Sequence, residues 1–177
     1  MSCASYTMSG LAVGCKDSIG GIKKAWFAPY GVHVTVSANT LTINGDADIA
    51  QFKVYNFRKA TGSMTSTLNT SENAGNSFTT EVNLQFLKQE TAKRLEVMAL
   101  LMNEMVGVIK DGNGKYWYIG YDYPIEASAG TAETGTAMTD LNGYNITIQD
   151  NSVELPYEIV DANTISALEA IEVAGGA

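Results

Sequence analysis

The sequence predicts a mainly β domain of the α+β class, in which a single long helix packs against antiparallel strands. The 177-residue chain has 17 glycines and only three prolines, a composition that favours many short strands and turns over a helical bundle. Apolar and polar residues alternate along several short segments, as in half-buried strands. Between about residues 88 and 105 the apolar residues instead recur every three or four positions, as in a helix. The length fits one domain that can bury a core.

The first half of the chain reads as a polar arm followed by short strands. Residues 1–17 are small and polar, and we expect an N-terminal arm there. A polar stretch at 69–76 is too hydrophilic to be buried, so it should connect two strands at the surface. The strands predicted between these two segments are 18–28, 32–36, 40–43, 52–57 and 63–68.

The central part of the chain, from Phe78 to Asp122, is predicted to be a strand, a helix and a hairpin in succession. Residues 78–86 alternate strictly between apolar and polar, and the helix follows at about 88–105. Two further strands, 106–110 and 115–121, flank a turn whose glycines and Asn tolerate positive φ, so they should pair as a hairpin.

The second half of the predicted helix is apolar on every side. Leu95, Met98 and Met102 form one stripe that can cover the chain's own sheet, and Val97 and Leu101 then point elsewhere. A helix that is apolar all round is buried all round. Either another subunit or loops of the same chain would provide the second cover.

The remaining chain is predicted to contain a long loop, two strands and a tail. Residues 126–140 are almost all small, and a loop of that length in a compact domain tends to be either mobile or functional. Strands are predicted at 144–149 and 154–159, the second at a sheet edge because it contains Pro156. Residues 160–177 are weakly amphipathic and form either a short helix or an arm on a neighbour.

The net charge of −8 is unevenly distributed along the chain. Residues 1–121 hold 11 Lys and Arg against 9 Asp and Glu, whereas residues 122–177 hold 10 Asp and Glu and no Lys or Arg. Because no basic stripe is available to neutralise phosphates, specific nucleic-acid binding is disfavoured. The acidic part either repels DNA or is simply a solvated surface.

Motifs of catalysis and of metal or cofactor binding are absent from the sequence, so we expect no enzyme and no cofactor. The single histidine, His33, lies in a predicted strand with no nucleophile motif near it. Cys3 and Cys15 with His33 are too few ligands for a zinc site. Aromatic residues at 116–123 form either a carbohydrate platform or core packing, and packing is the simpler account. No apolar run is long enough to span a membrane, and the N-terminus does not look like a secretion signal.

Five segments share a pattern with known proteins: Ile19–Trp26, Phe86–Leu95, Val108–Trp117, Ala129–Ala137 and Asp140–Tyr144. Together they resemble a family of small virion structural proteins from tailed phages of Bacteroidetes-type hosts. Their order and spacing agree with the family over residues 18–159, leaving the two terminal segments outside. The resemblance implies an antiparallel β-sandwich or barrel with one helix, like tail tube subunits. It also implies a virion protein, made in the host cytoplasm, that forms homo-oligomeric, hexameric rings stacked around a DNA channel and contacts other virion proteins.

This interpretation assigns two sets of residues. Contacts between subunits are expected from the helix, the small-residue loop and the tail, at Val97, Leu100, Leu101, Thr131, Ala132, Glu133, Thr134, Ile165 and Leu168. An acidic channel lining, past which DNA moves without specific binding, is expected from Glu126, Glu133, Asp140, Asp150 and Glu154. The alternatives are a head-tail connector ring or capsid-decorating protein and a carbohydrate-binding module.

Overall fold

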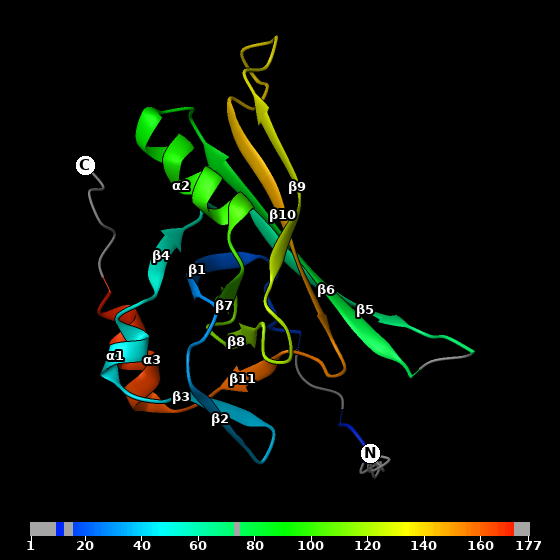
Figure 1. Cartoon of the computed structure of the whole chain (residues 1–177). Coiled ribbons are helices and arrows are strands. Elements are labelled where there is room, and N and C mark those ends of the chain that lie inside the picture. Colours follow the sequence, from blue (N-terminus) through cyan, green and yellow to red (C-terminus); the bar gives the residue numbers. More distant parts are fainter. Residues whose placement is uncertain (1–9, 13–15, 73–74, 172–177) are drawn as a thin grey trace.

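The protein is mainly β, with a sandwich-like arrangement of two sheets (Figure 1). The structure, a computed structural model, describes residues 10–12, 16–72 and 75–171. Cys3 and Cys15 lie outside the described residues, as does most of the predicted N-terminal arm. The predicted fold class is therefore confirmed at the level of a mainly β, two-sheet protein.

The larger sheet has seven strands in the order β2-β3-β11-β8-β7-β1-β4. Neighbouring strands are antiparallel except β3 and β11, which run parallel. The strand bounds are β1 Ile22–Pro29, β2 Val34–Ser37, β3 Thr40–Ile43, β4 Lys53–Asn56, β7 Met105–Asp111, β8 Tyr116–Ile119 and β11 Tyr157–Ile159. The predicted hairpin is confirmed, since β7 and β8 pair around a turn in which Asp111 Oδ1 accepts the N–H groups of Asn113 and Lys115.

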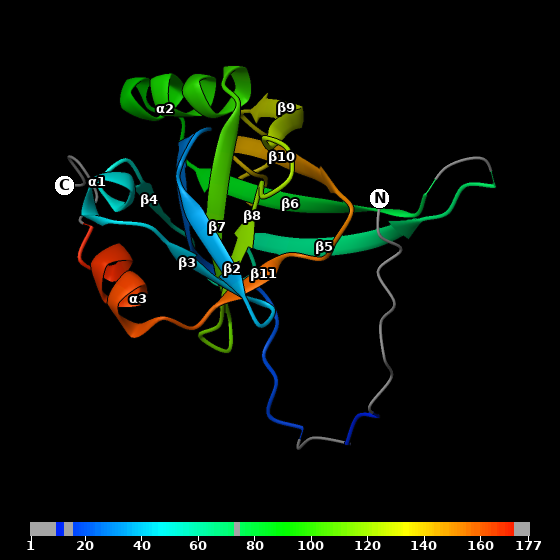
Figure 2. The same ribbon diagram turned by 60° about the horizontal axis from the view of Figure 1, so that its bottom comes forward.

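The smaller sheet has four antiparallel strands in the order β5-β6-β10-β9. The central strands β6 and β10 are the longest and pair from Gly143 opposite Leu87 to Ser152 opposite Phe78. The strand bounds are β5 Gly62–Asn69, β6 Ser77–Leu87, β9 Glu126–Glu133 and β10 Gly143–Ser152. The β5–β6 and β9–β10 hairpins both extend beyond the seven-stranded sheet (Figures 1 and 2).

The two sheets and the helices enclose two apolar clusters, one on each face of the seven-stranded sheet. Because side chains alternate along a strand, β1 supplies Phe27 to the cluster between the sheets and Trp26 to the opposite cluster. The four-stranded sheet contributes Val82, Ile146 and other apolar residues to the first cluster. Helices α1 (Asp46–Ile49) and α3 (Ala162–Glu169) lie beside the opposite face (Figure 2).

Helix α2, Thr91–Met102, is shorter than the predicted 88–105. Lys88 has φ of 66°, a left-handed conformation that a right-handed helix cannot contain. At the other end, Met105 exchanges two backbone hydrogen bonds with Ile125 and begins β7. Both boundaries are therefore set by the strands on either side of the helix.

The prediction of a long loop at 126–140 is wrong for its first half, which forms β9. The small residues of this segment make room for α2. A Cβ atom added to Gly130 would lie 2.8 Å from Leu101 Cδ2. The lack of bulky residues, which suggested a loop, reflects the close approach of a helix to a strand.

The last strand, β11, is not at an edge as predicted, because it pairs with β8 on one side and β3 on the other. Pro156 precedes the strand, so its missing N–H removes no bond from the sheet. In the part of the tail that the structure describes, residues 160–171, a short helix forms, which was one of the two expectations for it. Asp161 caps α3 by accepting the N–H of Thr164 at 2.7 Å.

Candidate functional site

The outward face of the four-stranded sheet is polar along its whole length. On β6 the buried Thr80, Val82 and Leu84 alternate with outward residues, and β10 follows the same pattern. Hydrogen bonds join the outward side chains across the strands: Asn69 to Thr79 at 2.7 Å, Thr79 to Asn151 at 3.0 Å and Thr147 to Asn83 at 2.7 Å. Along β10, Gln149 also donates to Asn151 at 3.0 Å. Neutral amides and hydroxyls thus cover most of this face.

The charges on these four strands are all negative. Their sequences contain no Lys or Arg, and their exposed carboxylates are Glu81, Glu126 and Glu133. Glu81 and Glu126 share a row across the sheet, because both are opposite Gln149. A face of this kind attracts no phosphate backbone, since binding DNA requires cations.

Both edges of this sheet are unpaired in the described part of the chain. The edge strands β5 and β9 are eight residues long, and each has one strand neighbour. The backbone N–H of Gln85 donates to the Thr61 carbonyl at 2.9 Å, so Thr61 and Gln85 form a hydrogen-bonded pair at the start of the β5–β6 ladder. In an antiparallel ladder, hydrogen-bonded and non-hydrogen-bonded pairs alternate. The N–H groups of Met64, Ser66 and Leu68 therefore point away from β6, to the free edge.

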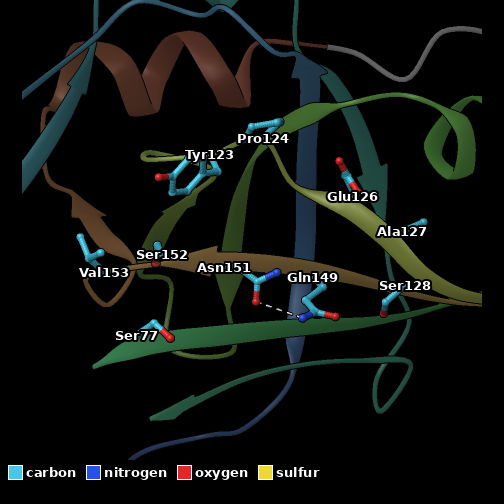
Figure 3. A pocket seen from close by; sticks show the side chains of 10 residues that line it. All are labelled: Ser77, Tyr123, Pro124, Glu126, Ala127, Ser128, Gln149, Asn151, Ser152 and Val153. Carbon is cyan, nitrogen blue, oxygen red and sulfur yellow. Dashed lines mark hydrogen bonds between the residues drawn. The ribbon is translucent and has the colours of Figure 1, made fainter. Parts of the chain in front are cut away.

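An open groove of about 710 Å³ lies at one end of the β9–β10 ladder (Figure 3). Its lining residues are Ser77, Tyr123, Pro124, Glu126, Ala127, Ser128, Gln149, Asn151, Ser152 and Val153. Tyr123 and Pro124 lie on one side of the groove, and the side chains of Gln149 and Asn151 rise from β10 opposite them. The groove therefore combines an apolar side with amide groups.

The helix α2 presents a different apolar face to solvent from the one that the sequence predicts. Val97 and Leu100 are buried against the chain's own sheet and Leu101 packs against the same core, although the sequence placed Val97 and Leu101 away from it. The stripe left exposed is Leu95, Met98 and Met102, with Met102 77% exposed. Val97 and Leu100 are thus corrected from subunit contacts to core residues.

The helix sequence contains two apolar stripes, and hydropathy alone does not show which of them packs against the sheet. The choice depends on β9, where Gly130 leaves space for the Leu101 side chain. The signal in the sequence was the run of small residues from Ala127 to Ala132, which complements a larger side chain on a helix.

The predicted contact residues of β9 are exposed, whereas those of the tail belong to the chain's own core. Thr131, Ala132, Glu133 and Thr134 are all accessible. Leu168 has no exposed surface, and its carbonyl accepts the Trp26 Nε1–H at 2.9 Å. Ile165 packs at the border of the same cluster. The tail prediction is therefore wrong for Leu168, because α3 covers its own sheet.

The five predicted acidic residues do not form one surface. Asp150 is 3% exposed, and its Oδ2 accepts the N–H of Gly120 at 3.1 Å, so it is a buried group and not a surface charge. Asp140 closes the β9–β10 turn by accepting the N–H groups of Thr136 and Ala137. Glu154 accepts a hydrogen bond from the Tyr157 hydroxyl. Glu126 and Glu133 remain as exposed charges at opposite ends of β9.

An ionic cluster around Glu169 fixes α3 and was not anticipated from the sequence. Glu169 accepts hydrogen bonds from Lys24, from Lys110 at 2.6 Å and from the Tyr116 hydroxyl at 2.7 Å. Burial would raise the pKa of Glu169, but these three donors outweigh it and hold the pKa at about 2. The cluster joins the last helix to the seven-stranded sheet, which is a structural role.

The aromatic residues at 116–123 divide into buried and exposed ones, with Tyr121 41% and Tyr123 62% exposed. Tyr116 and Tyr118 are buried in the cluster beneath α3, and the Trp117 indole donates to Asp111. His33 contacts Asp48 at 3.1 Å. Among residues 10–12, 16–72 and 75–171, no three potential ligands gather to hold a metal ion.

Within the same residues, no helix is long and apolar enough to cross a membrane. Comparisons of the chain with protein-family models, with curated proteins and with solved structures find no match.

Proposed function

We propose that this chain is a self-assembling structural subunit, specifically a tail tube subunit of a tailed-phage virion. Copies join through the free edges of the four-stranded sheet into rings that stack around a channel. The proposal rests on the four-stranded sheet. Its two edge strands are each eight residues long and unpaired on one side, and its outward face is polar and has no Lys or Arg. The family resemblance over residues 18–159 supports the same kind of assembly.

The free edges of the sheet can form backbone hydrogen bonds with another copy of the chain. An exposed edge presents unpaired N–H and C=O groups that can pair with another strand, and monomeric proteins usually shorten, charge or cover it. Here β5 and β9 carry no Lys and no Pro. Pairing β5 of one copy with β9 of the next would satisfy both edges, and a closed ring of such pairs leaves none free.

The outward face of the sheet has the chemistry that a channel for DNA requires. Its amides, hydroxyls and three exposed carboxylates offer no cation to a phosphate, so DNA would pass without specific binding. This assigns Glu81, Glu126 and Glu133 to the channel side.

The exposed stripe of α2 is a further contact surface between subunits in this proposal. Leu95, Met98 and Met102 lie side by side at helical spacing, and a contiguous exposed apolar patch is typical of an interface. These residues replace the helix positions expected from the sequence.

In this role the protein is made in the host cytoplasm, enters the virion and contacts other virion proteins, with six copies in a ring. A head-tail connector or capsid-decorating protein could close a ring in the same way without stacking further copies. A carbohydrate-binding module is favoured by one observation. Tyr123 is 62% exposed and lines the groove together with the amides of Gln149 and Asn151, an arrangement that suits a sugar.

The test uses one residue whose N–H points to the free edge. Ser66→Pro removes that N–H without breaking the β5–β6 ladder, because Ser66 is in a non-hydrogen-bonded pair. Ser66→Ala is the matched control. Both changes lose the side-chain hydrogen bond to Thr80, and only the proline blocks the edge.

We expect rings or tubes of the wild type and of Ser66→Ala in light scattering and negative-stain micrographs across a concentration series. Ser66→Pro should remain monomeric with an unchanged circular dichroism spectrum. Equal assembly of the two variants would overturn edge pairing. A wild type that is monomeric at every concentration would overturn self-assembly, and glycan binding by that monomer would then support the binding module.

A further inference from the structure

The turn between β9 and β10 presents one methionine entirely to solvent. Met138 is 106% exposed and lies midway in sequence between the end of β9 at Glu133 and the start of β10 at Gly143. This turn extends beyond the rest of the molecule (Figure 1). The turn has a defined shape, because Asp140 Oδ2 accepts the N–H groups of Thr136 at 2.8 Å and Ala137 at 2.7 Å. A single exposed apolar residue is ordinary, but one held at the tip of an ordered projection is suited to insertion.

The groove of Figure 3 lies at the opposite end of the same two strands. The tip connects the end of β9 at Glu133 to the start of β10 at Gly143, whereas the groove is lined by the start of β9 and the end of β10. Eight residues of β9 separate the two features by about 25 Å, at about 3.3 Å per residue.

We infer that the Met138 tip of one copy inserts into the groove of a second copy, in a head-to-tail contact. The groove offers the Tyr123 ring, Pro124 and Val153 to the methionine, and an unbranched thioether adapts well to such a surface. The amides of Gln149 and Asn151 face the backbone of the incoming turn. Both features belong to the same chain, which makes a second copy the occupant that the structure itself provides.

The charges and the symmetry of the contact agree with this arrangement. Residues Thr134 to Thr139 of the tip carry no charged side chain, and the Asp140 carboxylate at the base of the turn accepts the N–H groups of Thr136 and Ala137. The inserted residues are therefore not repelled by Glu126 at the groove. Because the tip and the groove are different surfaces, the contact is heterologous, and repeating it produces an open stack along the strand direction. It rests on the proposed function, since both need copies of this chain to associate. It adds the surfaces through which one copy follows the next.

The first experiment tests proximity by cross-linking. Two chains are prepared with Cys3→Ser and Cys15→Ser, one also carrying Met138→Cys and the other Val153→Cys. They are mixed and oxidised with copper phenanthroline. On a non-reducing gel we expect at least tenfold more heterodimer than from Met138→Cys mixed with Val160→Cys, a matched control because Val153 is 60% and Val160 55% exposed. Equal yields from the two mixtures would overturn the inference.

The second experiment separates stacking from ring closure. We expect Met138→Asp to form rings without stacks in negative-stain micrographs, because a carboxylate cannot enter an apolar site beside Glu126. Met138→Leu should stack as the wild type does. Normal stacks of Met138→Asp would overturn the inference and leave edge pairing intact. Assembly of Ser66→Pro combined with the 138–153 cross-link would overturn edge pairing and leave the head-to-tail contact intact.

Discussion

The seven-stranded sheet is covered on both faces, and its edge strands β2 and β4 are only four residues long. The four-stranded sheet is covered on one face, and its edge strands are twice that length. β4 begins with Lys53, a residue type that discourages pairing at an edge, and neither β5 nor β9 contains one. The two sheets therefore differ most at their edges.

This difference indicates a division of tasks within one chain. The seven-stranded sheet holds the larger aromatic side chains and the ionic cluster of Glu169, so it carries stability. The four-stranded sheet leaves backbone and polar groups available to a partner. Removing buried groups should thus harm the first sheet most, and changes to the outward face of the second should affect folding little.

The largest expected effect comes from Trp26→Ala in the seven-stranded sheet. Trp26 has no exposed surface and donates its Nε1–H to the Leu168 carbonyl, so its loss leaves a cavity and detaches α3. We expect the free energy of unfolding to fall by about 3–5 kcal/mol in urea denaturation. The control Asn145→Ala, exposed on β10, should cost less than about 0.5 kcal/mol. Similar losses in both variants would contradict the division between the sheets.

A smaller effect is expected from Glu169→Gln, and it should depend on pH. The pKa of Glu169 is lowered to about 2 from an ordinary value of 4.5, so its pairing with Lys24 and Lys110 stabilises the fold above about pH 4.5. This stabilisation is lost as the pH falls from about 4.5 to about 2. At pH 7 we expect Glu169→Gln to lower the free energy of unfolding by about 1–3 kcal/mol, since the cluster is partly solvated.

Denaturation of wild type and Glu169→Gln at a series of pH values checks this prediction, because other carboxylates titrate in both proteins and cancel. The matched control is Glu158→Gln, which breaks a more exposed pair with Lys115 and should cost less than about 0.5 kcal/mol. A stability gap that stays constant from pH 7 to pH 2 would show that the Glu169 pairs contribute nothing.

The smallest effect, opposite in sign, is expected at Asp150 in the four-stranded sheet. Its Oδ1 has no partner among the described residues, and burial, together with the nearby Asp122, raises the pKa of the carboxyl. The folded state therefore loses stability as the pH rises above about 4. We expect Asp150→Asn to equal or exceed the wild type at pH 7 by up to about 1 kcal/mol.

Thermal or urea unfolding at pH 4 and pH 7 measures this difference. Asp150→Ala should be less stable than Asp150→Asn, because alanine cannot accept the Gly120 N–H. An asparagine variant clearly less stable than the wild type at pH 7 would mean that the carboxylate is better satisfied than its contacts indicate.

Much of the secondary structure could be predicted from the sequence, because it follows local patterns. Strict alternation located β6, and the Asp111–Gly114 turn located the β7–β8 hairpin. The candidate site was predicted less well. Its exposed helix stripe and its groove depend on residues far apart in the chain, such as Tyr123 and Val153, which no local pattern relates.

The mainly β class, the positions of most strands and the charge split that leaves residues 122–177 without cations could all be read from the amino-acid sequence. These properties depend on side-chain periodicity and composition, which act locally. Three other features depend on the folded arrangement: Leu95, Met98 and Met102 face solvent, residues 126–133 form an edge strand, and Asp150 is buried. Each of these outcomes depends on which surface a distant segment covers. Long-range packing selects among local alternatives of similar free energy. An example is the space at Gly130 for Leu101, which determines which face of α2 packs against the sheet.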